Sequence, residues 1–341
     1  MNPKLPNIYA DPGPQLNVAL CQVYTEPWDL GGNLTRTLEA LAEAKRQGAD
    51  LAITPECVFH GYGFGRDQKE TLERYAQVAE PLDGPRLAAV RAAARARKMY
   101  VVVGFLQAGA AGVFHNAAAV ISPDGEIADV YHKVHCRTFE AIAHAGAFTP
   151  GNRFIATDLA VRDLQVRMGT LICFDREIPE STRCLRAMGA QLIACPLACD
   201  TEPLDKHRDY ADNEMVTRCR AAENEVFYVV VNHAGRFNGG SFAVGPGGEA
   251  LVQLGSAPEV RTILLPLHAL QTRASSAADL VVDRARQVNR LRDPAQRFEY
   301  TNLLREAFSH ASEGEREELL DLVIAAEEQG DMSSADDRLR R

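Results

Sequence analysis

Hydrophobic and polar positions follow two patterns along most of the chain. Short apolar runs of strand length recur, and between several of them apolar residues return every three or four positions, as on one face of a helix. The alternation predicts an α/β fold. The predicted strands are residues 17–23, 50–54, 100–106, 113–122, 126–133, 164–173, 191–195, 226–232 and 261–266, with short strands around the Gly245-Pro-Gly-Gly248 turn before the last of them. The predicted helices are residues 34–48, 87–98, 207–224 and one that begins at Pro179.

The connections indicate a sheet of mixed direction. Pro123-Asp-Gly125 is a tight turn that joins two strands directly, which makes those strands antiparallel. Other strands are joined through helices, which favours parallel pairs. The four prolines of residues 1–14 predict a flexible arm, and the charged residues 304–341 predict a helical extension that is partly disordered.

Composition narrows the class of protein. The 341 residues are 46% hydrophobic and 24% charged, with a net charge of −9, which argues against nucleic acid or an anionic membrane surface as a partner. Neither an 18-residue apolar run nor an apolar leader occurs, and eight cysteines without a small-domain framework suggest a reduced compartment. We therefore expect a cytoplasmic protein. Cys195 and Cys199 lack a second ligand pair at suitable spacing, so no metal site is expected.

Cys173 stands at the most informative position. An apolar strand leads into it, a sharp turn follows, and a helix begins at Pro179 with Glu180 in its first turn. A thiol near a helix N-terminus has a lowered pKa, and the thiolate is the nucleophile. The alternative is a buried structural cysteine, which is the commoner case for a cysteine taken at random.

Two further groups follow predicted strands. Glu56 comes directly after strand 50–54, and Lys133 ends strand 126–133. Active sites of α/β sheets gather at strand C-termini, and a thiol nucleophile needs a base and a group that stabilises the oxyanion. Taken singly, Glu56 could be a loop acid and Lys133 a solvated cation. The glycine-rich segment 61–65 reads as a shaped loop beside a pocket.

Three segments carry a family resemblance. Thr54-Pro-Glu56, Tyr131-His-Lys133 and the stretch from Leu171 to Glu180 resemble the signature segments of the nitrilase superfamily of carbon–nitrogen hydrolases. The likeness covers about residues 16–303. Further matching segments are residues 189–196, 218–224, 228–232 and 240–241.

The resemblance implies a four-layer α-β-β-α sandwich with mixed sheets, a hydrolase domain over residues 15–303, and a homodimer or larger homo-oligomer. It implies a catalytic triad of Glu56, Lys133 and Cys173, and no metal or organic cofactor. Many members have a second glutamate after the lysine. Glu140 and His144 are both candidates for that position.

Substrate residues are also suggested by the resemblance. Phe174 and the acid after it resemble the amidase and N-carbamoyl hydrolase branches, and the Phe174 main-chain N–H would help hold the oxyanion. Arg176 resembles the position where N-carbamoyl-D-amino acid hydrolases hold the substrate carboxylate. Alternatively, Arg176 pairs with a neighbouring acid. Asn116 and Asn232 are further candidates for the pocket; alternatively, each is a core polar residue whose hydrogen bonds are satisfied within the protein.

The predicted function is hydrolysis of a non-peptide C–N bond, in a linear amide or an N-carbamoyl group. A cysteine thioester would form, and ammonia or an amine would be released. The partner would be that small-molecule substrate. One alternative is a nitrilase that converts a nitrile to acid and ammonia. Another is a catalytically silent binding or regulatory member of the fold.

Overall fold

A computed structural model of the chain describes residues 15–267 and 270, apart from 111, 143–145 and 200–212. The predicted arm (1–14) and charged extension (304–341) lie outside the described residues and stay predictions. None of the described helices is long and apolar enough to cross a membrane.

Two six-stranded sheets organise the described residues, and both mix parallel and antiparallel pairs. The first sheet has the order β12-β1-β2-β3-β4-β5 and the second the order β11-β10-β9-β8-β7-β6. The first comprises β1 (Leu16–Gln22), β2 (Leu51–Ile53), β3 (Tyr100–Ala108), β4 (Phe114–Ile121), β5 (Ile127–His132) and β12 (Glu259–Leu265). The second comprises β6 (Ala156–Val161), β7 (Leu164–Thr170), β8 (Leu192–Pro196), β9 (Phe227–Val231), β10 (Phe242–Val244) and β11 (Ala250–Gln253).

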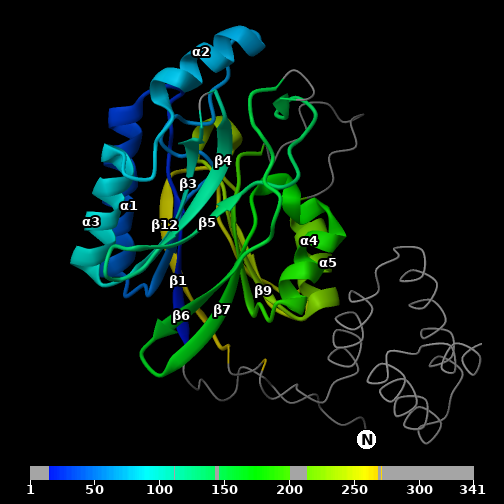
Figure 1. Cartoon of the computed structure of the whole chain (residues 1–341). Helices are drawn as coiled ribbons and strands as arrows, with labels where there is room; N and C mark the ends of the chain where they lie inside the picture. The colour runs from blue at the N-terminus through cyan, green and yellow to red at the C-terminus, as the bar shows by residue number, and fades with distance from the viewer. Residues whose placement is uncertain (1–14, 111, 143–145, 200–212, 268–269, 271–341) are drawn as a thin grey trace, which may run out of the picture. The chain divides into compact units, whose positions relative to one another are not determined.

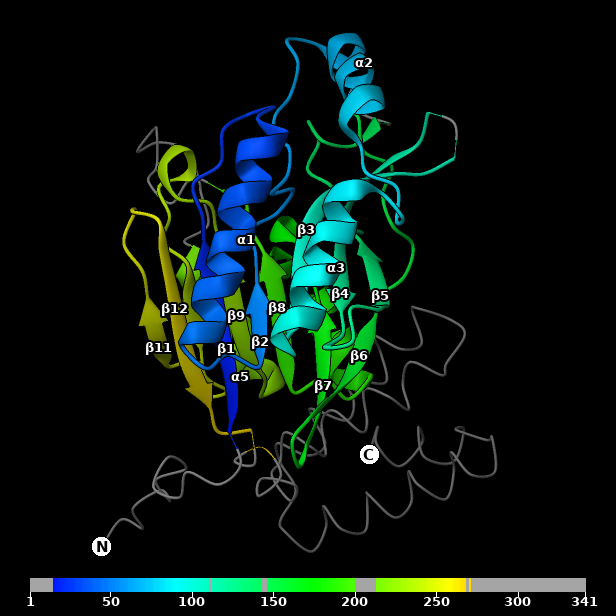
Figure 2. The ribbon, with the colours of Figure 1, turned by 90° about the vertical axis from the view of Figure 1, so that its left-hand side faces the viewer.

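Helices cover the outer faces of both sheets. Figure 2 shows α1 (Leu30–Arg46) and α3 (Pro85–Arg97) over the first sheet. Figure 1 shows α4 (Pro179–Ala187) and α5 (Asn213–Asn224) over the second. The order of layers is therefore helix, sheet, sheet, helix, and the predicted α-β-β-α sandwich with mixed sheets is confirmed.

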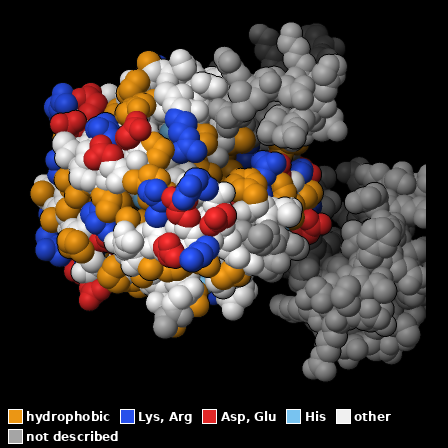
Figure 3. All heavy atoms as spheres, turned by 90° about the horizontal axis from the view of Figure 1, so that it is seen from above, with side chains coloured by type: hydrophobic (Ala, Val, Ile, Leu, Met, Phe, Trp, Pro, Cys, Tyr) orange, Lys and Arg blue, Asp and Glu red, His pale blue; other side chains and the backbone are white. Residues whose placement is uncertain are grey.

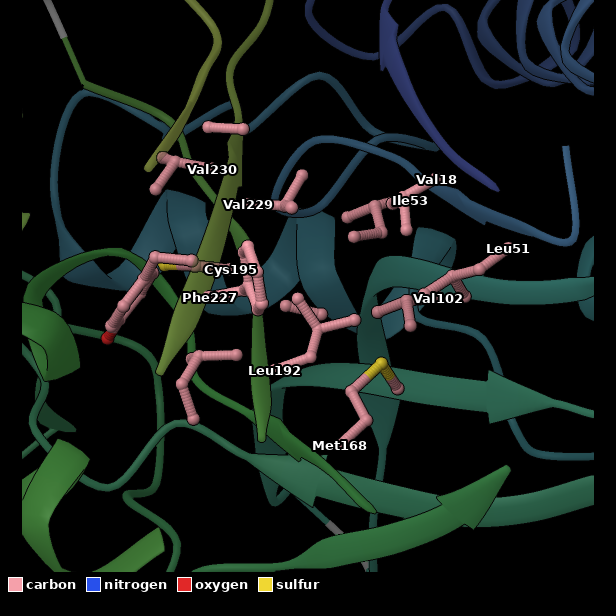
Figure 4. Packing of buried hydrophobic residues seen from close by; sticks show 14 of the residues in the cluster. Val18, Leu51, Ile53, Val102, Met168, Leu192, Cys195, Phe227, Val229 and Val230 are labelled. Carbon is pink, nitrogen blue, oxygen red and sulfur yellow. The ribbon is translucent and has the colours of Figure 1, made fainter. Parts of the chain in front are cut away.

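The largest core lies between the two sheets, as Figure 4 shows. Val18, Ile53 and Val102 of the first sheet face Met168 and Leu192 of the second, and all five side chains are buried. Each side of a strand packs on a different neighbour because successive side chains point to opposite faces. The alternate positions of the first sheet therefore form a second core under α1 and α3.

Two elements were not predicted. Helix α2 (Gln68–Val78) has few apolar positions, and only Thr71 and Tyr75 are buried. In strand β6, buried and exposed side chains do alternate, with Thr157, Leu159 and Val161 buried, so this period of two could have revealed the strand.

On the face of the molecule shown in Figure 3, basic, acidic and hydrophobic side chains are interspersed.

Candidate active site

Cys173 lies in a tight turn at the end of β7. Its φ of 49° places it in the left-handed region, which is rare for a residue with a side chain. Asp175 fixes the turn, since its Oδ2 accepts from the Tyr131 hydroxyl at 2.8 Å and from the Ile172 N–H at 3.1 Å. Only 3% of Cys173 is exposed. The turn thus holds the thiol at one place within the protein.

Glu56 follows β2 and is held through its main chain. Its N–H donates to the carbonyl oxygen of Leu197 at 3.3 Å, and its carbonyl accepts from His233 Nε2 at 2.7 Å. Both partners belong to segments that follow strands of the second sheet. Gly104 of β3 lies so close that a Cβ there would be 2.9 Å from the Glu56 Cα. A side chain at position 104 would therefore displace this acid.

Lys133 joins two carboxylates in a buried cluster. Its Nζ lies 2.9 Å from Glu56 Oε1 and 2.8 Å from Glu140 Oε1. Asn116 Nδ2 donates to Glu56 Oε1 at 2.6 Å, and the Tyr62 hydroxyl donates to Glu140 Oε1. Glu56 Oε2 is buried and has no hydrogen-bond partner in the part of the chain that the structure describes. That oxygen is available to accept a proton.

Burial and neighbouring charges set the protonation states here. Burial raises the pKa of Glu56 to about 7, although Lys133 lowers it, and the Glu140 charge raises it further. Burial acts to lower the pKa of Lys133, but Glu140 and Glu56 outweigh this effect and raise it well above its ordinary value. Lys133 is therefore a cation, while Glu56 can gain and lose a proton near neutral pH.

The predicted lowering of the Cys173 pKa is wrong. Burial raises the pKa of Cys173 well above its ordinary value, and the Glu56 charge adds to this, against a smaller opposing effect of Lys133. Helix α4 begins only at Pro179, so the thiol does not sit at the helix N-terminus. Cys173 rests as a neutral thiol, so it can become a nucleophile only if a base removes its proton.

The sequence model of the carbon–nitrogen hydrolase family matches residues 17–274. The chain belongs to this family. It is a carbon–nitrogen hydrolase of the amidase-like branch of the nitrilase superfamily.

Curated relatives include amidases. An (R)-stereoselective amidase of a Pseudomonas species is 35% identical over 256 residues, covering 73% of this chain and 84% of the relative. An N-carbamoylputrescine amidase of Arabidopsis thaliana is 26% identical over 242 residues, covering 66% of this chain and 78% of the relative.

Solved structures with the same fold include an amidase from Nesterenkonia sp.. It has a TM-score of 0.62 and 28% identity, over 78% of this hydrolase and 94% of that chain. A mutant of the amidase from Nesterenkonia sp. AN1 shows covalent addition of the acetamide moiety of fluoroacetamide at the active-site cysteine. Its TM-score is 0.62 at 27% identity, over 78% of this hydrolase and 95% of that chain.

The hydrolase holds Arg176 inside the protein. The side chain is buried, and its Nη1 donates to the Cys173 carbonyl oxygen at 2.9 Å and lies 3.6 Å from Glu177 Oε1. These contacts favour the alternative in which Arg176 pairs with a neighbouring acid and supports the turn. The predicted carboxylate-binding role receives no support from them.

The other predicted substrate residues are placed as follows. Phe174 is half-buried beside Cys173, and Asn116 belongs to the charged cluster through Glu56. Asn232 directs its Nδ2 to three main-chain carbonyl oxygens, so its contacts are those of a residue that joins loops. Of the two candidates for the fourth position, Glu140 is in the cluster, and His144 lies outside the described residues.

Neither Tyr62 nor Thr25, which binds His233, was predicted as part of the site. Tyr62 lies in the glycine-rich segment 61–65, which was predicted to be a shaped loop without a role for the tyrosine hydroxyl. His233 accepts at Nδ1 from the Thr25 hydroxyl at 2.6 Å, across 208 positions of sequence. No local pattern could have joined those two residues.

Proposed function

We propose that this enzyme hydrolyses linear carboxamides and releases ammonia through a thioester on Cys173. The observation that carries the proposal is the buried cluster in which Lys133 lies between Glu56 and Glu140. The cluster supplies a base whose pKa of about 7 suits neutral pH, together with a fixed cation for a developing negative charge.

In the first step, Glu56 takes the proton of the Cys173 thiol on Oε2, and the sulfur forms a bond to the amide carbon. The carbonyl oxygen becomes an oxyanion, which the Lys133 ammonium and the Phe174 main-chain N–H stabilise. Losing one such donor typically costs about 10²–10³ in rate. Glu140 and Tyr62 keep Lys133 in place.

In the second step, the C–N bond breaks and Glu56 gives its proton to the departing nitrogen, which leaves as ammonia. A water molecule then enters, loses a proton to Glu56 and attacks the thioester carbon. The C–S bond breaks, the carboxylic acid leaves, and the thiol recovers its proton from Glu56. One carboxyl group thus serves as base and acid in turn, typically worth about 10²–10⁴ in rate.

A carboxamide fits better than an N-carbamoyl amino acid. The prediction of an N-carbamoyl amino acid depended on Arg176 as the carboxylate ligand, and this side chain is buried and bonded to the Cys173 carbonyl. The relative with 35% identity is named an amidase, whereas the N-carbamoylputrescine amidase shares 26%.

The deciding experiment measures ammonia release from matched carboxamides, N-carbamoyl amino acids and nitriles of the same carbon chain. The Cys173→Ala enzyme is the blank. We expect kcat/KM to be highest for the carboxamides. Preference for the nitriles would make the enzyme a nitrilase, and turnover of none of the three would favour a silent binding member. The homo-oligomer and the cytoplasmic location stay predictions. Measuring the size of the protein in solution tests the first, and locating it in the cell tests the second.

A further inference from the structure

Arg137 lies at the edge of the cluster, beside the nucleophile turn. Its main-chain N–H donates to Glu140 Oε2 at 2.7 Å. Its guanidinium carbon lies 5.5 Å from the centroid of the Phe174 ring, and Phe174 directly follows Cys173. The arginine therefore contacts both sides of the site: the acid that binds Lys133 and the residue after the nucleophile.

The guanidinium of Arg137 has no acidic partner in the described part of the chain. Among the arginines of those residues, only Arg137 and Arg153 make no side-chain hydrogen bond or ion pair. Arg153 is exposed to water, whereas Arg137 is half-buried. A partly desolvated cation gains more from an anionic partner than an exposed one does.

Two buried acids of the site, Glu140 and Asp175, are already engaged. Glu140 accepts from Lys133 with both oxygens and from Tyr62. Asp175 binds His135 as well as the turn. An anion for Arg137 would therefore come from a bound molecule.

Two exposed apolar side chains follow Arg137 in the sequence. Phe139 is 54% exposed and Ile142 is 39% exposed, on either side of Glu140. The Phe139 ring lies 5.8 Å from that of Phe64. Apolar neighbours exclude water and strengthen a charge pair. Their own exposure suits the apolar part of a small organic substrate.

We propose that Arg137 binds an anionic group on the acyl part of the substrate, so that the enzyme prefers carboxamides that bear a carboxylate. The inference rests on the proposed amidase function. A guanidinium presents two parallel N–H donors to a carboxylate, which gives orientation as well as affinity. The Phe174 ring would hold the guanidinium plane in position.

The test compares amides that differ only in the distal group. Succinamate, glutaramate and adipamate carry a carboxylate at increasing distance, and 4-methylpentanamide, 5-methylhexanamide and 6-methylheptanamide replace it with an isopropyl group. For at least one chain length, wild-type enzyme should favour the anion in kcat/KM. Arg137→Ala should lower the anion-to-neutral ratio by about 10- to 100-fold, mainly through KM, as expected for a charge-assisted hydrogen bond.

Two further variants separate charge from packing. Arg137→Glu should lower the ratio further and improve kcat/KM for the cationic amide 5-aminopentanamide. Arg153→Ala, a loss of one exposed arginine, should leave the ratio at the wild-type value. An unchanged ratio in Arg137→Ala, or wild-type enzyme with no preference for any anion, would overturn the inference while leaving the amidase function intact. Absence of ammonia release from every amide would instead overturn the proposed function.

Discussion

His233 Nε2 donates a hydrogen bond to the main-chain carbonyl oxygen of Glu56 over 2.7 Å. Because a carbonyl can only accept, Nε2 carries the proton and Nδ1 accepts from Thr25. Burial lowers the pKa of His233 to about 3, so the ring stays neutral and keeps this tautomer. The histidine therefore positions Glu56, the proposed base.

His233→Ala should lower kcat by about 10- to 100-fold with little change in KM, because misplacement of a catalytic group by about 1 Å is that costly. His233→Gln can donate from its own Nε2 and should recover most of the loss. Steady-state kinetics with thermal melting as the folding check will test this. Equal damage in the two variants would mean that the ring serves packing alone.

Cys173→Ala should abolish ammonia release and leave the melting temperature close to that of the wild type. The substitution removes one sulfur atom from the turn, and the Asp175 bonds that hold the turn remain. Cys173→Ser should be nearly as inactive, since a carboxylate is too weak a base for a hydroxyl. Residual activity of a tenth or more in the alanine enzyme would rule out the nucleophile assignment.

Lys133→Ala should lower kcat by at least about 10²–10³, the typical effect of losing an oxyanion donor. It should also destabilise the fold by about 3–5 kcal/mol, because two buried carboxylates lose their common cation. Lys133→Arg should not restore the rate, since the wider guanidinium does not fit a fully buried site between two acids. A near-normal rate in the Lys133→Arg enzyme would show that the site needs only a positive charge there, and not an ammonium group at one fixed position.

The sequence supported the α/β layers and the strand-end positions of Glu56, Lys133 and Cys173, because both depend on local patterns. It did not reveal which residues of other strands and loops each of these three side chains contacts. The pKa of Cys173 was predicted with the wrong sign because burial, which depends on the whole fold, outweighs the turn. The bond of Thr25 to His233 likewise depends on two distant segments meeting.

His60 is buried, and neither ring nitrogen has a hydrogen-bond partner in the described part of the chain. Burial lowers its pKa to about 3. In the unfolded chain its pKa is about 6.5. Above that pH the ring is neutral in both states and does not affect the free energy of unfolding. Below it, the unfolded chain binds a proton that the folded protein does not, so the fold loses stability as the pH falls toward about 3. Each pH unit in this window costs about 1.4 kcal/mol per such histidine.

His60→Leu should therefore weaken the acid dependence of the unfolding free energy between pH 6.5 and 4.5, measured by urea denaturation. Tyr75→Phe is the matched control. It changes a neighbouring ring, 5.4 Å from His60, without removing a group that titrates in this range. If both variants lose stability with acid as steeply as the wild type, His60 does not contribute to acid unfolding.

The last prediction concerns the pH dependence of the rate. Glu56 must be ionised to accept the thiol proton, and its pKa is raised to about 7. We therefore expect kcat/KM to rise with pH up to about 7. Lys133 imposes no fall near neutrality, because its pKa is raised well above the ordinary value. The rising part of this pH profile, its acid limb, lies at a pH that depends on the charges around Glu56.

Glu140 is one of those charges, and its carboxylate raises the pKa of Glu56. Glu140→Gln removes the negative charge, so the acid limb should move to lower pH, while the maximal rate falls because Lys133 loses one of its two anchors. Tyr62→Phe removes only the hydroxyl that binds Glu140 and keeps the charge, so its limb should move less. An acid limb that stays in place or moves upward in Glu140→Gln would show that another group governs the rate.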